Sequence, residues 1–235
     1  MRLLGIVLAT LMMNVVAASQ TVKDSGKRQG EISYSASQHN EDVVLDILRP
    51  VLTSSGYVAR LYYAGQCAAI DPEFVCFPAT EVHQPMGSGF RAIESIFRGD
   101  ASVTVSKESN NIVSIKIGRP FTTVLQTRVL MFRSASLEQY NPSFAIGSLL
   151  GTPEVTAEMV RLRLRVPIRF YDLGVVQPGK GRPHMPSIMS NMTVDQILDS
   201  VAVTFQGIVV YGICPEPSGR KMYTVDFVGL GSDIK

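Results

Sequence analysis

The chain has 235 residues, of which 46% are hydrophobic and 18% charged, and this composition excludes an intrinsically disordered protein. Its 22 basic and 20 acidic residues give a formal net charge of +2, which predicts no nucleic-acid partner. The 19 Gly and 13 Pro residues are too few for a low-complexity chain, so we expect a folded protein.

Residues 3–18 form an apolar run at the start of the chain. Val16 and Ala18 place small side chains at positions −3 and −1 of a cleavage site, as in a secretory signal peptide. An uncleaved membrane anchor is the alternative, but the run is shorter than the roughly 20 residues that a spanning helix needs. We therefore predict a signal peptide over residues 1–18, a flexible tether over residues 19–30, and an exported protein that is periplasmic or extracellular and not membrane-spanning after cleavage.

Export gives the three cysteines a possible redox role, because an oxidising compartment favours disulfides. Cys67 and Cys76 have eight residues between them, and we predict a disulfide between them. A loop of about ten residues would contribute on the order of 2 to 3 kcal/mol by the chain-entropy model. Cys214 is then expected as a buried small hydrophobe, with a bond to Cys67 or Cys76 as the alternative. The cysteines and histidines show no metal-ligand spacing, so the sequence predicts no metal and no cofactor.

The first predicted module spans residues 31–118. Its first helix begins at Asn40, which can cap it, and ends at Gly56, while Pro50 should kink the helix or end it early. Alternating apolar and polar residues predict strands around this helix and a hairpin at the end of the module. The further elements that we predict are strands at 32–36, 57–63 and 74–77, a helix at 90–97, and hairpin strands at 103–105 and 112–117.

The second predicted part is a connecting segment, residues 119–184, with short helices and one distinctive strand. A strand is expected at 124–132. Asn141 and Thr152 each precede a proline, and each predicts the start of a short helix. Three prolines and three glycines at 174–186 indicate an exposed loop.

The distinctive strand is predicted at residues 160–170, where apolar residues alternate strictly with polar ones. Pro167 favours an edge position for it. Guanidinium groups spaced about 6.6 Å apart on one face repel one another unless they are solvated or matched to an anionic partner. One interpretation is a solvated face whose arginine stems cover apolar neighbours, and the other is a binding surface. The candidate binding residues on this face are Arg161, Arg163, Arg165 and Arg169.

The second predicted module spans residues 185–235. Thr193 caps a helix with one apolar face, and two strands follow at 208–213 and 222–228. This order of helix, strand and strand also occurs at 90–117. We therefore predict an α+β fold of mixed β-sheets covered by helices on one face, with two small strand-helix-strand modules.

Residues 192–201, with the sequence Met-Thr-Val-Asp-Gln-Ile-Leu-Asp-Ser-Val, precede a Gly-containing strand that ends in Tyr211. This stretch resembles the short N-terminal domain of secretins and TonB-dependent receptors, in which a Thr-Val-acid-x-x-Leu helix precedes a Gly-aromatic strand and a hairpin. Residues 32–63 resemble the family's opening unit and residues 90–117 its closing unit, so that about half of the chain is covered. The resemblance implies a small periplasmic α+β module that works by binding other proteins.

No catalytic residue is predicted, because no nucleophile stands near an organised base in the sequence pattern. Ser218 and Lys221 have the Ser-x-x-Lys spacing of penicillin-binding enzymes, but they lie in a hairpin turn and not at a helix start. Asp195 and Asp199 are four residues apart and could bind a cation, although acids in a first turn that face solvent are the simpler explanation.

The function that these patterns favour is an exported, non-enzymatic protein-interaction module of the cell envelope. Its expected partner is an envelope protein or an anionic surface polymer. The alternatives are a hydrolase that acts on an envelope polymer and a carrier of a small apolar ligand. A deep pocket with two or more titratable side chains in hydrogen-bond reach would favour the hydrolase, and a shallow surface would favour the interaction module.

Overall fold

The computed structural model describes residues 40–67, 75–108, 111–165 and 181–231, which all belong to one compact unit. The predicted signal peptide, the tether and the strand at 32–36 lie outside the described residues.

The described residues form helices and strands in the proportions of an α+β fold, as the sequence predicts. The helices are α1 (Asn40–Ser55), α2 (Phe90–Ile96), the 3-10 helix η1 (Thr123–Gln126), α3 (Ser136–Tyr140), α4 (Pro142–Leu150), α5 (Pro153–Arg161) and α6 (Val194–Phe205). The strands are β1 (Val58–Ala64), β2 (Gln66–Cys67), β3 (Val75–Cys76), β4 (Val103–Lys107), β5 (Ile112–Ile117), β6 (Arg128–Arg133), β7 (Leu164–Arg165), β8 (Ile188–Thr193), β9 (Gly207–Pro215) and β10 (Lys221–Gly229).

Six of these strands form one mixed sheet in the order β4-β5-β1-β9-β10-β7. Strand β1 is central and runs parallel to both β5 and β9. The antiparallel hairpins β4–β5 and β9–β10 lie on either side of it, and β7 pairs in parallel with β10 at one edge. Strands β2 and β3 form one small antiparallel ribbon, and β6 and β8 form another. The predicted module boundaries at residues 118 and 184 therefore fall within one compact unit that shares a single sheet.

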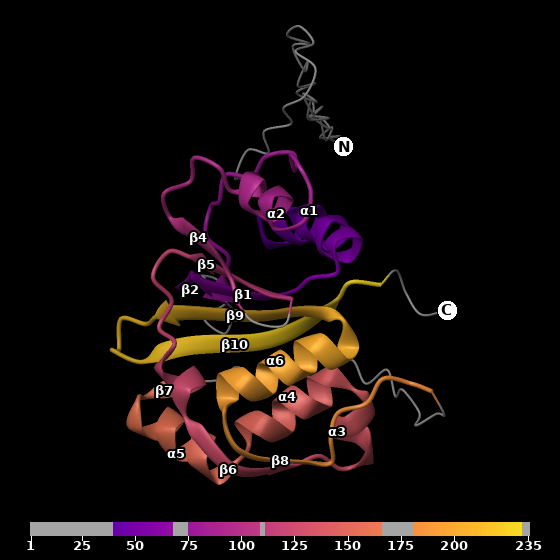
Figure 1. Cartoon of the computed structure of the whole chain (residues 1–235). Helices are drawn as coiled ribbons and strands as arrows, with labels where there is room; N and C mark the ends of the chain where they lie inside the picture. Colours follow the sequence, from indigo (N-terminus) through magenta and orange to yellow (C-terminus); the bar gives the residue numbers. More distant parts are fainter. Residues whose placement is uncertain (1–39, 68–74, 109–110, 166–180, 232–235) are drawn as a thin grey trace, which may run out of the picture. The chain divides into compact units, whose positions relative to one another are not determined.

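Helices cover both faces of this sheet, whereas the sequence analysis expected them on one face (Figure 1). Helices α1 and α2 lie on one side, and α4 and α6 on the other. Strand β1 contributes side chains to the cores on both sides of the sheet, because a central parallel strand is buried on its two faces. Ala59, Leu61 and Tyr63 pack with α1 and α2, while Val58 and Tyr62 pack toward α6.

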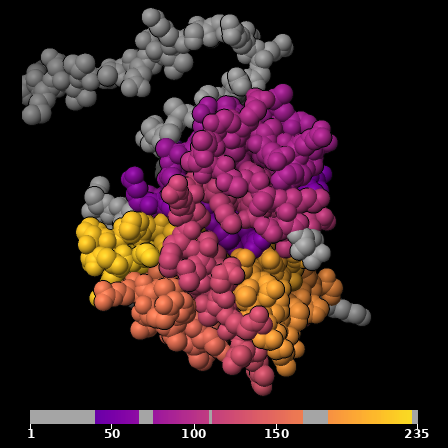
Figure 2. All heavy atoms as spheres, turned by 60° about the vertical axis from the view of Figure 1, so that its left-hand side comes forward, coloured from indigo at the N-terminus to yellow at the C-terminus, as the bar shows by residue number. Residues whose placement is uncertain are grey.

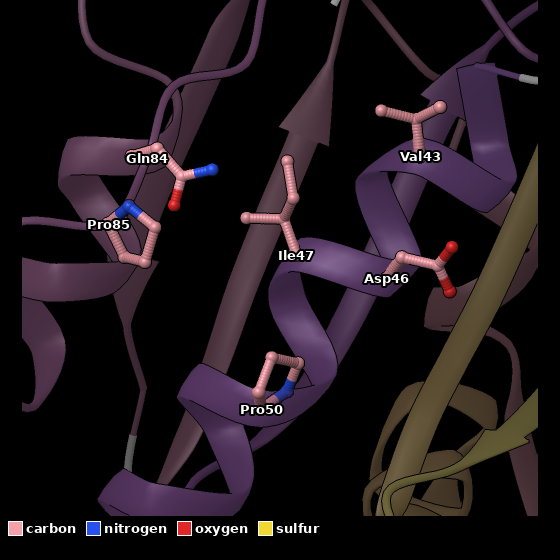
Figure 3. A pocket seen from close by; sticks show the side chains of 6 residues that line it. All are labelled: Val43, Asp46, Ile47, Pro50, Gln84 and Pro85. Atoms are coloured by element: carbon pink, nitrogen blue, oxygen red, sulfur yellow. The ribbon is translucent and has the colours of Figure 1, made fainter. Parts of the chain in front are cut away.

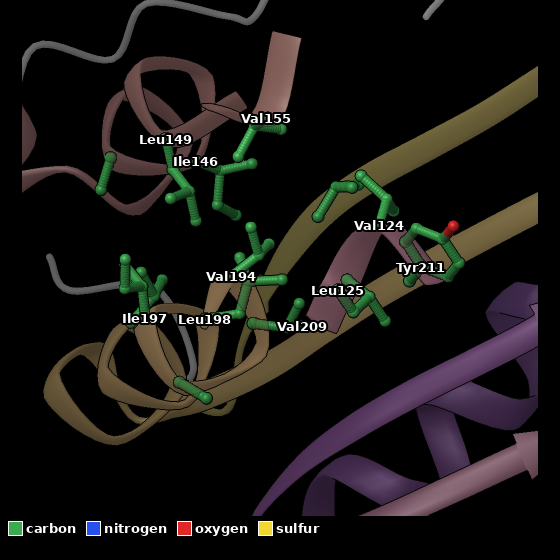
Figure 4. Close-up of a cluster of buried hydrophobic side chains, with 14 of the residues drawn as sticks. Val124, Leu125, Ile146, Leu149, Val155, Val194, Ile197, Leu198, Val209 and Tyr211 are labelled. Carbon is green, nitrogen blue, oxygen red and sulfur yellow. The ribbon is translucent and has the colours of Figure 1, made fainter. Parts of the chain in front are cut away.

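The layer on the α6 side is a continuous apolar core (Figure 4). Helix α6 begins after Thr193, as predicted. The Thr193 side chain accepts a hydrogen bond from the Gln196 amide, and the Gln196 side chain accepts one from the Thr193 amide. Ile197 and Leu198 are fully buried against Val209 of β9. The helix is therefore fixed at its start by hydrogen bonds and along its length by packing.

One glycine in β9 fits the packing between the central strands. A Cβ atom at Gly212 would lie 2.3 Å from the ring of Tyr63 on β1, which is closer than a Cβ atom comes to another non-bonded heavy atom. Gly212 thus leaves the space that the buried Tyr63 ring occupies on its strand neighbour.

The predicted strand at 160–170 is confirmed at Leu164–Arg165, which form the edge strand β7, and is wrong for residues 160–163. Helix α5 continues to Arg161, and Leu164–Arg165 are the residues that join the sheet. The same stretch also carries helical spacing, because Val155, Met159 and Leu162 can lie on one face of a helix. These three side chains pack onto the α6-side core, while Val160 is left 73% exposed, so the helical period prevails.

Two other expectations need correction. Helix α1 does not end early, because the turn after Pro50 buries Val51 and Leu52 and continues to Ser55. The strand expected at 124–132 begins at Arg128, because residues Thr123–Gln126 form η1 and bury its two apolar side chains in the core.

The predicted disulfide between Cys67 and Cys76 is also wrong, because Cys76 is an exposed free thiol. Cys214 is fully buried in β9 and is disulfide-bonded, and no complete disulfide pair lies within the described side chains. The prediction rested on export and on the short spacing of the two cysteines, whereas the folded backbone decides which cysteines can meet.

Candidate functional site

A groove of about 710 Å³ lies on the surface between the end of α5, strand β7 and the β9–β10 turn. We call it the arginine groove. In Figure 2 the yellow atoms of the β9–β10 hairpin lie beside the orange-red atoms of the segment near residue 160. The residues that line the groove are Val160, Arg163, Leu164, Arg165, Glu216, Ser218 and Arg220.

Two of the four arginines predicted to bind an anion line this groove, and they do so from a turn and a short strand. Arg163 is exposed, and Arg165 lies 3.9 Å from a carboxylate oxygen of Glu216. Arg161 lies at the end of α5 and makes a two-pronged ion pair with Glu158, with nitrogen–oxygen distances of 2.6 and 2.5 Å. Arg169 lies outside the described residues. The predicted single arginine face is therefore divided between a helix end and a groove.

Arg220 is the groove residue that sequence reasoning missed. It follows the β9–β10 turn, and the 160–165 segment comes beside it because β7 pairs with β10. The sequence signal was limited to a basic pair, Arg220 and Lys221, after a Pro-Gly turn. Only the long-range pairing of β7 with β10 places this guanidinium beside Arg163.

The described residues that line the groove include more arginines than acidic residues. Arg163, Arg165 and Arg220 line it, and among the described lining residues Glu216 carries the one carboxylate. The side chains of Arg163 and Arg220 pair with no carboxylate of the described residues. A guanidinium without a partner offers forked N–H donors to carboxylate or phosphate oxygens. The groove is thus suited to bind an anion.

The backbone of Arg163 is held in an unfavourable conformation. Its φ of 53° lies in the left-handed region, which side chains other than glycine seldom adopt. The Lys221 amide donates to the Arg163 carbonyl at 3.2 Å, and this bond joins the residue to β10. Residues held in this way often lie at binding sites, where neighbouring structure fixes the side-chain position.

A second polar site is buried between β1 and α6. Arg60 lies in the middle of the central strand with its side chain 8% exposed. It forms ion pairs with Asp195 and with Asp199, the latter at 3.2 Å, and its other nitrogen lies 3.6 Å from Glu108. The Tyr62 hydroxyl donates a hydrogen bond to Asp195. We call Arg60, Tyr62, Asp195 and Asp199 the Arg60 cluster.

This cluster corrects the expectation that Asp195 and Asp199 simply face solvent. Their side chains are largely buried and turn toward Arg60, because the first turns of α6 pack over β1. A charged residue in the middle of an apolar strand was the sequence signal for such a partner, since an unpaired buried charge is costly.

Burial and the neighbouring charges shift the pKa values of three groups in the Arg60 cluster. Burial by itself lowers the pKa of Arg60, but the neighbouring groups of Tyr62, Asp195 and Asp199 raise it. Burial, followed by the charge of Asp195, raises the pKa of Tyr62 well above its usual value. Burial outweighs the effect of Arg60 at Asp199 and raises the pKa of Asp199 to about 6. The pKa values of Arg60 and Tyr62 thus move further from neutral pH, whereas that of Asp199 moves toward it.

Another hollow, of about 280 Å³, lies in the layer of α1 and α2, between α1 and the segment before α2 (Figure 3). Val43, Asp46, Ile47 and Pro50 of α1 line it from one side. Gln84 and Pro85 line it from the other, so that its surface is mostly uncharged. This site has the chemistry of a shallow apolar contact.

Within the residues that the structure covers, none of the helices is both long and apolar enough to cross a membrane. The covered residues likewise contain no group of three acidic, histidine or cysteine side chains placed to hold a metal ion. Comparison of the chain with protein-family models, curated proteins and solved structures finds no match.

Proposed function

We propose that the protein is an exported interaction module that binds an acidic segment of another envelope protein in the arginine groove. The observation that carries this proposal is that two arginines lining the groove, Arg163 and Arg220, make no ion pair with the described residues. The role is binding and needs no catalytic group. It also agrees with the resemblance of residues 192–201 to envelope domains that bind other proteins.

The chemistry of the groove favours a carboxylate-bearing peptide. Each guanidinium can donate two parallel hydrogen bonds to one carboxylate, which gives direction as well as attraction. Val160 is 73% exposed beside these arginines and offers an apolar contact that a peptide side chain can cover. The volume of about 710 Å³ lies within the usual range of ligand-binding sites.

The hydrolase alternative has its best candidate in the Arg60 cluster, and two observations make it the weaker proposal. Both oxygens of Asp195 already accept hydrogen bonds, one from Arg60 and one from Tyr62. The adjoining pocket holds about 140 Å³, below the range of roughly 300 to 1,000 Å³ typical of ligand sites, so a polymer has little room there.

The test measures binding of a fluorescein-labelled Asp/Glu-rich peptide to the mature protein by fluorescence anisotropy at several salt concentrations. The variant Arg163→Gln/Arg220→Gln should bind at least about tenfold more weakly and with less salt dependence, because two charge contacts are lost. The matched control is Arg91→Gln, which changes an exposed arginine on α2 on the opposite layer.

Equal affinity and equal salt dependence for the two variants would refute the groove as the binding site. Binding of polygalacturonate in place of the peptide, with loss in the groove variant, would refute the protein partner and assign the groove to an anionic polymer. A second groove variant, Arg163→Gly, separates binding from folding. It should fold at least as stably as the wild type, because glycine relieves the left-handed backbone, yet it should bind the peptide more weakly.

A further inference from the structure

The sheet face on the α6 side changes from apolar to polar between the central strand and the β4–β5 hairpin. Strands β9, β10 and β1 supply apolar side chains to the core beneath α4 and α6. Strand β5 contributes only Ile112 to that core, and its next two residues on the same face are Ser114 and Lys116. Their β4 partners are Ser106 and Thr104, so this end of the sheet face is polar.

A small pocket of about 140 Å³ lies at the boundary between the apolar and polar parts. We call it the β1–β5 pocket. It is bordered by the Arg60 cluster on one side and by η1 on another. The residues that line it are Arg60, Tyr62, Glu108, Ser114, Lys116, Thr122, Leu125, Gln126 and Asp195.

Ser114 provides the first evidence for a ligand in this pocket. Its side chain lines the pocket, the residue is 1% exposed, and it pairs in register with Arg60 on β1. Its hydroxyl makes no hydrogen bond to any residue that the structure describes. A buried hydroxyl is normally hydrogen-bonded, because removing it from water without a partner costs stability. The pocket therefore presents a buried polar group that a ligand can satisfy.

Charges of both signs line the pocket and provide the second evidence. Lys116 is exposed, and its ammonium pairs with no carboxylate of the described residues. Glu108 is 41% exposed and follows β4, beside the opposite end of β5. The backbone positions next to these two charges, 112 and 116, are four residue steps apart along β5, a distance of about 13 Å before the side chains reach inward. Ser114 lies between them on the same face.

We infer that the β1–β5 pocket binds a small zwitterion with the chemistry of an α-amino acid. Lys116 and Ser114 bind its carboxylate, and Glu108 binds its ammonium. A simple anion is disfavoured because Glu108 and Asp195 line the same space, and a simple cation is disfavoured by Lys116 and Arg60. The small volume restricts the ligand to a few heavy atoms.

This site is independent of the arginine groove. The pocket lies at the β4–β5 side of the sheet, and the groove lies at β7, which is the other edge strand. An amino-acid ligand and an acidic peptide can therefore be tested on the same protein without competing for one surface.

The experiment is isothermal titration of the mature protein with L-alanine, propionate and ethylammonium as probes. L-Alanine carries both charges, and each of the other two carries one charge on a chain of the same size. L-Alanine should bind at least about tenfold more tightly than either, because each charged hydrogen-bonding end adds about 1.5 to 3 kcal/mol, or tenfold and more. Absence of L-alanine binding, or propionate binding as tight as that of L-alanine, would overturn the inference.

Two variants locate the site. Lys116→Met removes the ammonium at an exposed position and should weaken L-alanine binding at least about tenfold. The matched control is Lys107→Met on the adjacent strand β4, whose side chain points to the other face and lies over Tyr57. Far-UV circular dichroism checks that both variants fold. Unchanged binding in Lys116→Met, or equal loss in both variants, would overturn the assignment of the pocket.

Discussion

The most informative stability experiment replaces Arg60 with methionine. Methionine keeps an unbranched apolar side chain along the central strand but removes the positive charge that faces Asp195 and Asp199. The surrounding side chains are poorly exposed, 8% at Arg60, 18% at Asp195 and 24% at Asp199, so water can screen the remaining carboxylates only weakly. Arg60→Met therefore leaves two acids in a buried site without their cation.

The expected loss is about 3 to 5 kcal/mol, the usual cost of removing one partner from a buried ion pair. A domain of this kind has a total stability of about 5 to 15 kcal/mol, so the variant should lose a large part of it. Urea unfolding followed by far-UV circular dichroism gives the free energy of unfolding by linear extrapolation. The control Arg91→Met removes an exposed charge on α2 and should change stability by less than about 0.5 kcal/mol.

A compensated variant separates the charge effect from a packing effect. Arg60→Met combined with Asp195→Asn and Asp199→Asn should recover most of the lost stability, because no buried charge is then left unpaired. The amide oxygen at position 195 can still accept the Tyr62 hydroxyl. The reasoning is refuted if Arg60→Met loses less than about 1 kcal/mol, or if the compensated variant is no more stable than Arg60→Met alone.

Asp199 should make the protein less stable as the pH rises from near 3.8 to about 6, because its pKa is raised by burial and the folded state holds the proton more tightly than the unfolded state. Asp199→Asn should remove that part of the decline in urea unfolding measured across this range, and the same slope in both proteins would contradict the pKa shift. Alkylation without a reductant should modify Cys76 and leave Cys214 protected until a reductant is added. Peptide mapping is then expected to find Cys67, the third cysteine of the chain, cross-linked to Cys214, and alkylation of Cys214 without reduction would show that this bond is absent.

Local features of the sequence were enough to predict most elements and several of their ends. Thr193 and Asn141 begin helices through their own hydrogen bonds to nearby amides, which depend on neighbours within three residues. The hairpin of β4 and β5 follows from alternation and turn residues, and strand β9 follows from a continuous apolar run that ends at a turn before β10. The α+β class follows from the order of these elements, because each amphipathic helix needs a sheet face to cover its apolar side.

Only the tertiary structure decided how residues far apart in the sequence meet. Residues 160–162 carried both a period-two and a helical pattern, and packing of Met159 and Leu162 on the core selected the helix. Arg60 meets Asp195 across 135 residues, and Arg163 lies in the same groove as Arg220 because β7 pairs with β10. Sequence periodicity records which face of an element is apolar, but it carries no information on which element will cover that face. That choice depends on strand order and register, and these are set by the burial of the whole core at once.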